Sequence, residues 1–188
     1  MVEELPEVAA LAGVAFADDP IMRWTMSPGS AGLEVVSERF FAAFHRSASD
    51  WLWVAGDADV DGMAMWVPPD PGGAYASVLA AIDADVAALA GDHKGRYDTL
   101  WAWVEEQRPS EPHWYLEHVA VRDELRGRGV GSALVEHGLS MARRDRLSVW
   151  LVTAKERNVG FYERFGFEVS VTGNAPDGGP GLWCMQLR

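Results

Sequence analysis

Apolar residues in the first half of the chain follow two different spacings. Apolar positions three or four residues apart predict amphipathic helices over 5–16, 33–44, 78–89 and 97–104. Aromatic and β-branched residues instead crowd into 51–56 and 60–68, with Asp and Gly between them, which predicts a hairpin of two strands. Proline-containing segments, "DDP" at 18–20 and "RPSEP" at 108–112, end the first and the fourth helix.

The second half carries the same patterns in a different order. Strands are predicted over 113–121, 147–154, 167–173 and 181–187, and helices from about Gly129 to Ala142 and over 158–166. The stretch 147–154 is continuously apolar, which is typical of a strand buried on both faces. Because no repeat, low-complexity tract or linker interrupts the pattern, residues 1–188 are predicted to form one α/β domain with a mixed sheet.

Charge is distributed unevenly along this acidic chain. The net charge of −12 argues against a general binder of nucleic acid or of anionic membranes. The stretch 122–146 is an exception, because its six arginines outnumber its four carboxylates. An acidic protein with one basic patch is suited to an anionic ligand at that patch.

Cysteine and histidine contents disfavour a metal site. The single cysteine, Cys184, excludes an internal disulfide and a cysteine-based zinc cluster. No metal-ligand spacing appears among His45, His93, His113 and His137, so we expect no metal. The longest apolar run near the N-terminus, 8–17, is too short to span a bilayer, and we expect a cytoplasmic protein that does not bind membranes.

A glycine-rich stretch, "LRGRGVGS" (125–132), lies between a predicted strand and a predicted helix. Its glycines let backbone amides approach an anion, and the first turn of the helix supplies unpaired N–H groups. A P-loop requires a lysine before Ser132, where the chain has Gly131, and a dinucleotide-binding loop reads GxGxxG after the first strand. An Arg-x-x-Gly-x-Gly turn for the pyrophosphate of coenzyme A remains, beside a plain turn that only connects strand and helix.

A second stretch, "TAKERNVGFYERFGFE" (153–168), favours the coenzyme A alternative. Together with the glycine loop it resembles the GNAT superfamily of N-acetyltransferases, strongly over 113–168 and more loosely elsewhere. Within that superfamily, "AFADDP" (15–20), "RPSEPHWYLEHVAV" (108–121) and "GPGLWCM" (179–185) resemble puromycin N-acetyltransferase and its relatives. The resemblance implies an α/β fold of the α+β type, with a mixed, mostly antiparallel sheet that splays around acetyl-CoA and is flanked by helices. The family usually opens with a strand, and we expect it to be absent or very short here.

Acetyl-CoA is the cosubstrate that the resemblance implies. The resemblance assigns the following residues to the binding of acetyl-CoA: Val119, Ala120, Val121, Arg126, Gly127, Arg128, Gly129, Val130, Gly131, Ser132, Asn158 and Phe161. In that assignment, the backbone of Val119 and Val121 pairs with the pantetheine arm, and the loop that follows holds the pyrophosphate. Tyr162 stands where family members place the acid that serves the CoA thiolate, since a phenol with a pKa of about 10 stays protonated at neutral pH. The alternative is that Tyr162 only packs its helix onto the sheet.

Glu117 is the candidate base that would deprotonate the amine. Period-two alternation places it on the same face as Tyr115, Val119 and Val121, with His118 on the other face. Several family members use a carboxylate on this strand for that purpose. The alternative is that Glu117 binds a cationic substrate or faces solvent.

The acceptor side of the site is implied only by the resemblance. It lies near Met22, Trp24, Trp66, Trp114 and Tyr115, of which Trp24, Trp66 and Tyr115 are predicted to line the substrate pocket. For each of these residues, core packing is the alternative. The stretch 70–110 resembles a lid over a small pocket more than an open peptide groove.

These observations together predict direct acetyl transfer to the primary amine of a small molecule, for example an antibiotic-like one. The alternatives are a protein lysine or N-terminal acetyltransferase and a non-catalytic acyl-CoA-binding module. Direct transfer needs no acyl-enzyme, so Cys184 is predicted to be a buried strand residue. The protein is expected to be a monomer or a homodimer that pairs through an exposed final strand.

Overall fold

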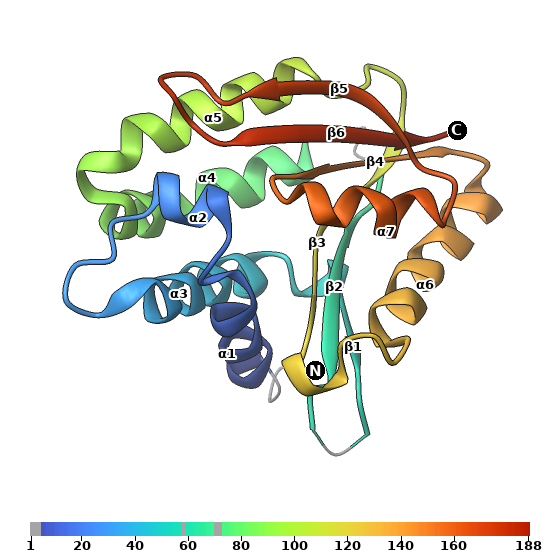
Figure 1. The fold of residues 1–188 in the computed structure, drawn as a ribbon, viewed down its shortest axis with the longest axis horizontal. Coiled ribbons are helices and arrows are strands. Elements are labelled where there is room, and N and C mark those ends of the chain that lie inside the picture. The colour runs from blue at the N-terminus through green and yellow to red at the C-terminus, as the bar shows by residue number, and fades with distance from the viewer. Residues whose placement is uncertain (1–4, 58, 70–72) are drawn as a thin grey trace.

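The computed structural model describes residues 5–57, 59–69 and 73–188 (Figure 1). The first half of the chain forms α1 (Leu5–Phe16), α2 (Pro20–Thr25), α3 (Gly32–Ser47), β1 (Leu52–Ala55), β2 (Gly62–Val67), α4 (Ala74–Ala90) and α5 (Lys94–Glu106). The second half forms β3 (His113–Val121), α6 (Val130–Asp145), β4 (Ser148–Thr153), α7 (Val159–Glu163), β5 (Glu168–Asn174) and β6 (Gly181–Leu187). The predicted helices and strands are confirmed.

Helix α2 is the element that the apolar pattern missed. It begins at Pro20, whose fixed φ suits a first helical position, and the Asp19 carboxylate accepts the Ile21 N–H at 2.9 Å. The segment "DDP" therefore ends one helix and starts the next. The described residues begin with α1 and hold no strand before it, whereas residues 1–4, where a short first strand would lie, are outside the described part.

The six strands form one mixed sheet in the order β1-β2-β3-β4-β6-β5. Strands β3 and β4 are parallel and the other pairs are antiparallel, which confirms the predicted α/β fold with a mostly antiparallel sheet. Pairing between β3 and β4 covers only 113–116 and 148–151, after which the two strands separate. Figure 1 shows the result, with β1–β3 and β4–β6 running in different directions. The expectation of an exposed final strand is wrong, because β6 lies between β4 and β5.

Strand β3 contains a bulge at the point where it leaves β4. Met65 of β2 pairs with His118 and Trp66 pairs with Leu116, so Glu117 has no partner of its own on β2. The bulge interrupts the alternation of faces.

Helices cover both faces of the β1–β3 half of the sheet (Figure 1). Helices α1, α3 and α4 pack on the face that carries Met63 and Met65. Helix α6 packs on the opposite face, which carries Ala64 and Trp66. Helix α5 covers the next part of the sheet, around Trp150 of β4. Hydrophobic cores thus lie on both faces of the β1–β3 half of the sheet.

One segment, Ala74–Glu106, is long and apolar enough to cross a membrane when judged by length and composition alone. In the structure it is divided at Gly91, where the chain takes a φ of 52° between α4 and α5. Both helices line a cavity beside β3. The absence of membrane binding stays a prediction.

Candidate active site

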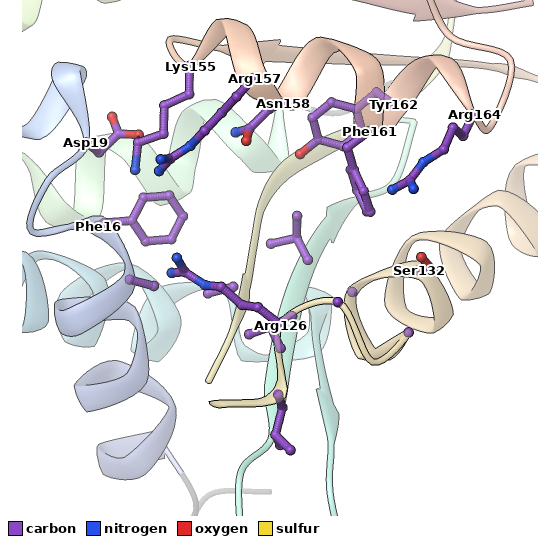
Figure 2. Close-up of a pocket in the computed structure, with 18 residues that line it drawn as sticks. Phe16, Asp19, Arg126, Ser132, Lys155, Arg157, Asn158, Phe161, Tyr162 and Arg164 are labelled. Carbon is purple, nitrogen blue, oxygen red and sulfur yellow. The ribbon is translucent and has the colours of Figure 1, made fainter. Parts of the chain in front are cut away.

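A cleft of about 430 Å³ lies where β3 and β4 separate (Figure 2). One side consists of β3 and the glycine loop, and the other consists of α7 and the residues before it. Of the residues predicted to bind the coenzyme, those that line it are Val119, Ala120, Val121, Arg126, Gly127, Gly129, Gly131, Ser132, Asn158 and Phe161. Arg128 and Val130 do not line it: Arg128 is exposed, and the Val130 side chain packs near Gly62 of β2.

The glycine loop brings backbone N–H groups to this cleft. Gly127 and Gly129 have φ values of 76° and 93°, which glycine adopts without strain. The first N–H groups of a helix have no acceptor within the helix. In α6 the N-cap residue is Gly129, and no side chain caps these groups. Together with the helix dipole, they form a site that favours an anion.

Gly131 keeps the cleft open beside this helix end. A Cβ at this position would lie 3.3 Å from Cγ2 of Val121 and 3.8 Å from the Phe161 ring. Its backbone φ is not in the left-handed region, so the reason for glycine here is space. A side chain would narrow the passage between β3 and α7.

Basic side chains surround the cleft. Those that line it are Arg126, Lys155, Arg157 and Arg164 (Figure 2). Arg126 lies 2.7 Å from the Asp123 carboxylate, and Arg157 lies 3.6 Å from Asp18, so both are paired with exposed acids that an anionic ligand would replace. The sequence prediction missed all but Arg126, although the others flank the predicted Asn158 within "AKERNVGFYER".

Lys155 and Asp19 form a partly buried pair at the back of the cleft. Their side chains are each 13% exposed and lie 3.7 Å apart, and Lys155 also contacts Asp18 at 2.6 Å. Burial raises the pKa of Asp19, whereas the positive charge of Lys155 acts in the opposite direction. Through these contacts, the connection between α1 and α2 packs against the segment that precedes α7.

Asn158 and Tyr162 both lie on the α7 side of the cleft. Asn158 Nδ2 donates to the Thr153 hydroxyl at 3.1 Å, which orients the amide at the end of β4. Tyr162 is 7% exposed, and its ring contacts Phe161 and Phe167. Burial, and secondarily the Asp19 carboxylate, raise the pKa of the Tyr162 phenol above its ordinary value. The phenol therefore remains a hydrogen-bond donor at any ordinary pH.

A second cavity, of about 1090 Å³, lies between β3 and helices α4 and α5. Its aromatic lining comes from Phe40, Phe44, Tyr75, Tyr97, Trp101 and Tyr115. Its carboxylates are Asp83, Asp98, Glu105, Glu111 and Glu117, and Arg108 is its arginine. The cavity thus combines an apolar body with negative charge.

Glu117 lines this second cavity at the bulge of β3. The predicted alternation of faces is wrong here, because Tyr115 packs toward α4 and α5 whereas Val119 packs toward α6. His118, which was expected on the face opposite Tyr115, points toward α3. The extra residue at the bulge is the physical reason for both errors. The Glu117 carboxylate contacts His118 Nδ1, and its side chain is 9% exposed.

The tryptophans predicted near the acceptor do not line this cavity. Trp66 lies in the core beneath α6, where its Nε1 donates to the Leu134 carbonyl at 3.3 Å and its ring occupies the space at Gly138. Trp24 stacks instead against the Arg96 guanidinium at 4.4 Å. Of the three residues predicted for the substrate pocket, Tyr115 is the one that lines it.

Three further residues named in the sequence analysis are buried: Cys184, Met22 and Trp114. Cys184 is buried in β6, and burial raises its pKa to about 11, so it is held as the thiol. Met22 and Trp114 are core residues, and Trp114 Nε1 donates to Asp145 at 3.0 Å. In the part of the chain that the structure describes, no group of three His, Cys, Asp or Glu residues is arranged to hold a metal ion.

Comparison with known sequences agrees with this geometry. The sequence model of the acetyltransferase (GNAT) family matches residues 23–167. The chain therefore belongs to the GNAT family of acetyltransferases.

Individual relatives are similar over shorter segments. A 5-NmdU N-acetyltransferase of Pseudomonas phage PaMx11 is 32% identical over 79 residues, which are 42% of this chain and 55% of the relative. The peptidyl-lysine N-acetyltransferase YjaB of Escherichia coli K12 is 39% identical over 56 residues, which are 30% of this chain and 37% of the relative. The matched region thus spans about half the length of the first relative and less of the second.

Solved structures share the fold over nearly the whole chain. A histone acetyltransferase HPA2 and related acetyltransferase from Corynebacterium glutamicum has a TM-score of 0.73 at 26% identity and covers 99% of this chain and 91% of its own. The polyamine N-acetyltransferase of Drosophila melanogaster has a TM-score of 0.66 at 17% identity and covers 100% of this chain and 96% of its own. The second likeness shows the fold alone.

Proposed function

We propose that the protein is an acetyl-CoA-dependent N-acetyltransferase that transfers the acetyl group directly to the primary amine of a small molecule. The observation that carries the proposal is that neighbouring residues of β3 line both cavities. Val119 and Val121 line the cleft with the basic side chains, and Glu117, two residues before Val119, lines the aromatic cavity. An acyl donor and an amine would therefore approach each other across one strand.

The basic cleft has the chemistry that coenzyme A requires. The uncapped start of α6, the space at Gly131 and the Arg126 guanidinium suit a pyrophosphate. After Leu116, β3 has no strand partner on its β4 side, so backbone groups of Val119 and Val121 are available to an amide-containing arm, as to an added strand. When bound, acetyl-CoA supplies the activated acetyl group as a thioester.

Two side chains would assist the transfer, one as a proton acceptor and one as a hydrogen-bond donor. Glu117 receives the proton of the attacking amine, directly or through water, because a carboxylate in the aromatic cavity is placed to bind an ammonium group and to accept its proton. Tyr162 donates a hydrogen bond to the departing thiolate. Because a thiol has a pKa of about 8.5, below that of the buried phenol, this hydrogen bond stabilises the thiolate without full proton transfer.

The second cavity suits an amine with one positive charge and a hydrophobic body. Asp83 and Asp98 both contact the Lys94 ammonium, at 3.1 and 2.6 Å. Glu105 contacts Arg108 at 2.7 Å. Glu111 is exposed to solvent, whereas Glu117 is mostly buried and contacts His118 rather than a lysine or an arginine. Glu117 is therefore the carboxylate placed to receive the substrate cation.

Two alternative functions, a protein acetyltransferase and an acyl-CoA-binding module, agree less well with the two cavities. Helices α4 and α5 cover the acceptor cavity, which favours a small molecule over a protein lysine or N-terminus. A candidate acid, Tyr162, in the cleft and a candidate base, Glu117, in the second cavity favour catalysis over an acyl-CoA-binding module. The sequence resemblance to puromycin N-acetyltransferase over 15–20, 108–121 and 179–185 stays a prediction, and on its basis an antibiotic-like amine is one candidate acceptor.

The proposal is tested by release of free thiol from acetyl-CoA with a panel of amines. The panel contains hydrophobic monoamines, aminonucleosides, polyamines and a lysine peptide. We expect the highest kcat/KM with a hydrophobic monoamine or an aminonucleoside, because Asp83, Asp98 and Glu105 are already paired with Lys94 or Arg108 and leave Glu117 to bind one cation. A preference for the lysine peptide would refute the small-molecule assignment, and no amine-dependent release with any acceptor would refute the enzymatic one.

A further inference from the structure

Behind Glu117 lies a buried pair of histidines that the acetyl transfer itself does not use. The Nδ1 of His118 contacts the Glu117 carboxylate, and its Nε2 lies 2.9 Å from the Nε2 of His45 in α3. His45 is fully buried and the His118 side chain is 4% exposed. Phe41 and Phe44 pack around the His118 ring. In such apolar surroundings each hydrogen bond is strong and an unpaired group is costly.

The hydrogen bonds determine where the protons lie. An ionised carboxylate only accepts hydrogen bonds, so His118 carries its proton on Nδ1 and donates it to Glu117. The Nε2 of His118 is then an acceptor, and His45 donates to it from a protonated Nε2. The remaining Nδ1 of His45 is unprotonated, and it is one of the buried side-chain atoms without a hydrogen-bond partner.

The hydrogen bonds of this pair oppose a second proton on either histidine. A second proton on His118, placed on Nε2, would require His45 to shift its own proton from Nε2 to Nδ1, where the N–H would be buried without an acceptor among the described residues. Burial, and secondarily the positive charge that a protonated His118 would carry, lower the pKa of His45 to about 2, so His45 does not take up the proton instead. Among the described residues, Nδ1 of His45 has no hydrogen-bond partner, so the row of hydrogen bonds that starts at Glu117 ends there. A proton taken up by Glu117 would therefore leave through the cavity.

We propose that His45 and His118 are positioning residues for Glu117: the neutral pair holds the carboxylate through one N–H and leaves its other lone pairs to the amine. This inference rests on the proposed function, in which Glu117 receives the amine proton. An imidazolium in place of neutral His118 would hold the carboxylate as an ion pair and make it a weaker proton acceptor. His45 opposes this by donating to the second ring nitrogen of His118, the one that would take the proton.

Other titratable groups near Glu117 do not produce the same pH dependence. Tyr75 of α4, Tyr97 of α5 and Tyr115 of β3 feel the charge of Glu117, and Arg108 faces Tyr75 and Tyr115. Burial, with the Glu117 charge as a smaller cause, raises the pKa of each tyrosine above its ordinary value. All three therefore stay neutral, and Arg108 stays charged, over the range in which histidines and carboxylates titrate.

Two substitutions of His45 separate the donated hydrogen bond from the packing. His45→Phe keeps a ring and removes the donor, whereas His45→Gln keeps an N–H at a position close to that of Nε2. With the best amine of the panel, we expect His45→Phe to lose kcat as the pH falls, by about tenfold at pH 6, with KM for acetyl-CoA unchanged. We expect His45→Gln to follow the wild-type profile. A wild-type profile for His45→Phe, or an equal loss for both variants, would overturn the inference.

Nitrogen-15 NMR of the histidine rings gives a readout that does not depend on activity. In the wild-type protein we expect the Nδ1–H tautomer for His118 and the Nε2–H tautomer for His45, with neither ring becoming charged between pH 5.5 and 8. The opposite tautomers, or an imidazolium spectrum for either ring, would overturn the inference even in an active enzyme. The expected spectra in a protein that acetylates no amine would instead refute the proposed function and retain the neutral pair.

Discussion

His45 should make the stability of this protein depend on pH. Its pKa falls from an ordinary 6.5 in the unfolded chain to about 2 in the folded one, because burial penalises the imidazolium. Between these values the unfolded chain binds more protons than the folded chain, so the free energy of unfolding rises with pH. The stabilisation is fully present above pH 6.5 and is lost as the pH falls below it. For one such group, the free energy of unfolding drops by about 2 kcal/mol between pH 7 and pH 5.

The assay is urea unfolding of the wild type and of His45→Gln across that pH range. Glutamine does not titrate, and it can still donate to His118, so it removes only the proton uptake of the unfolded state. We expect the stability difference between the two proteins to change by about 2 kcal/mol in favour of the variant on going from pH 7 to pH 5. All other titrating groups are common to both proteins and cancel. Parallel curves would show that His45 titrates equally in both states and would refute the reasoning.

Three substitutions test the two halves of the site. Tyr162→Phe should lower kcat by about 10²-fold with little change in acetyl-CoA affinity, and full kcat with the natural thioester would show that the hydroxyl is dispensable. Glu117→Gln should lower kcat by about 10²-fold or more and alter the acidic limb of the pH–rate profile, whereas an unchanged limb would remove it from proton transfer. Gly131→Ala should weaken CoA binding about tenfold in calorimetry, because its Cβ enters the space beside Val121, and Gly95→Ala in α5, with open space around it, should bind as the wild type does. Equal affinities for these two variants would contradict the placement of CoA against α6.

Local sequence patterns predicted the elements better than the contacts between them. Strands β3 and β6 begin and end at the predicted residues, because alternation and the flanking Pro112 and Pro180 define them. The bulge at Glu117 has no such signature, since neither glycine nor proline marks it. The position of Trp66 depends on which helix covers that face of β2, and the pairing of Asp19 with Lys155 joins segments distant in the chain. Neither contact follows from a pattern within one element.

Glu117 stands outside the packing pattern of the strand that carries it. With that residue left out, β3 would alternate without interruption, with Tyr115 and His118 on one face and Leu116 and Val119 on the other. The candidate base is thus carried by an inserted residue that replaces no core side chain. Deleting Glu117 would remove the carboxylate and leave the registration of both cores intact. The packing of the sheet and the presence of a carboxylate at this point of β3 can therefore change independently of each other.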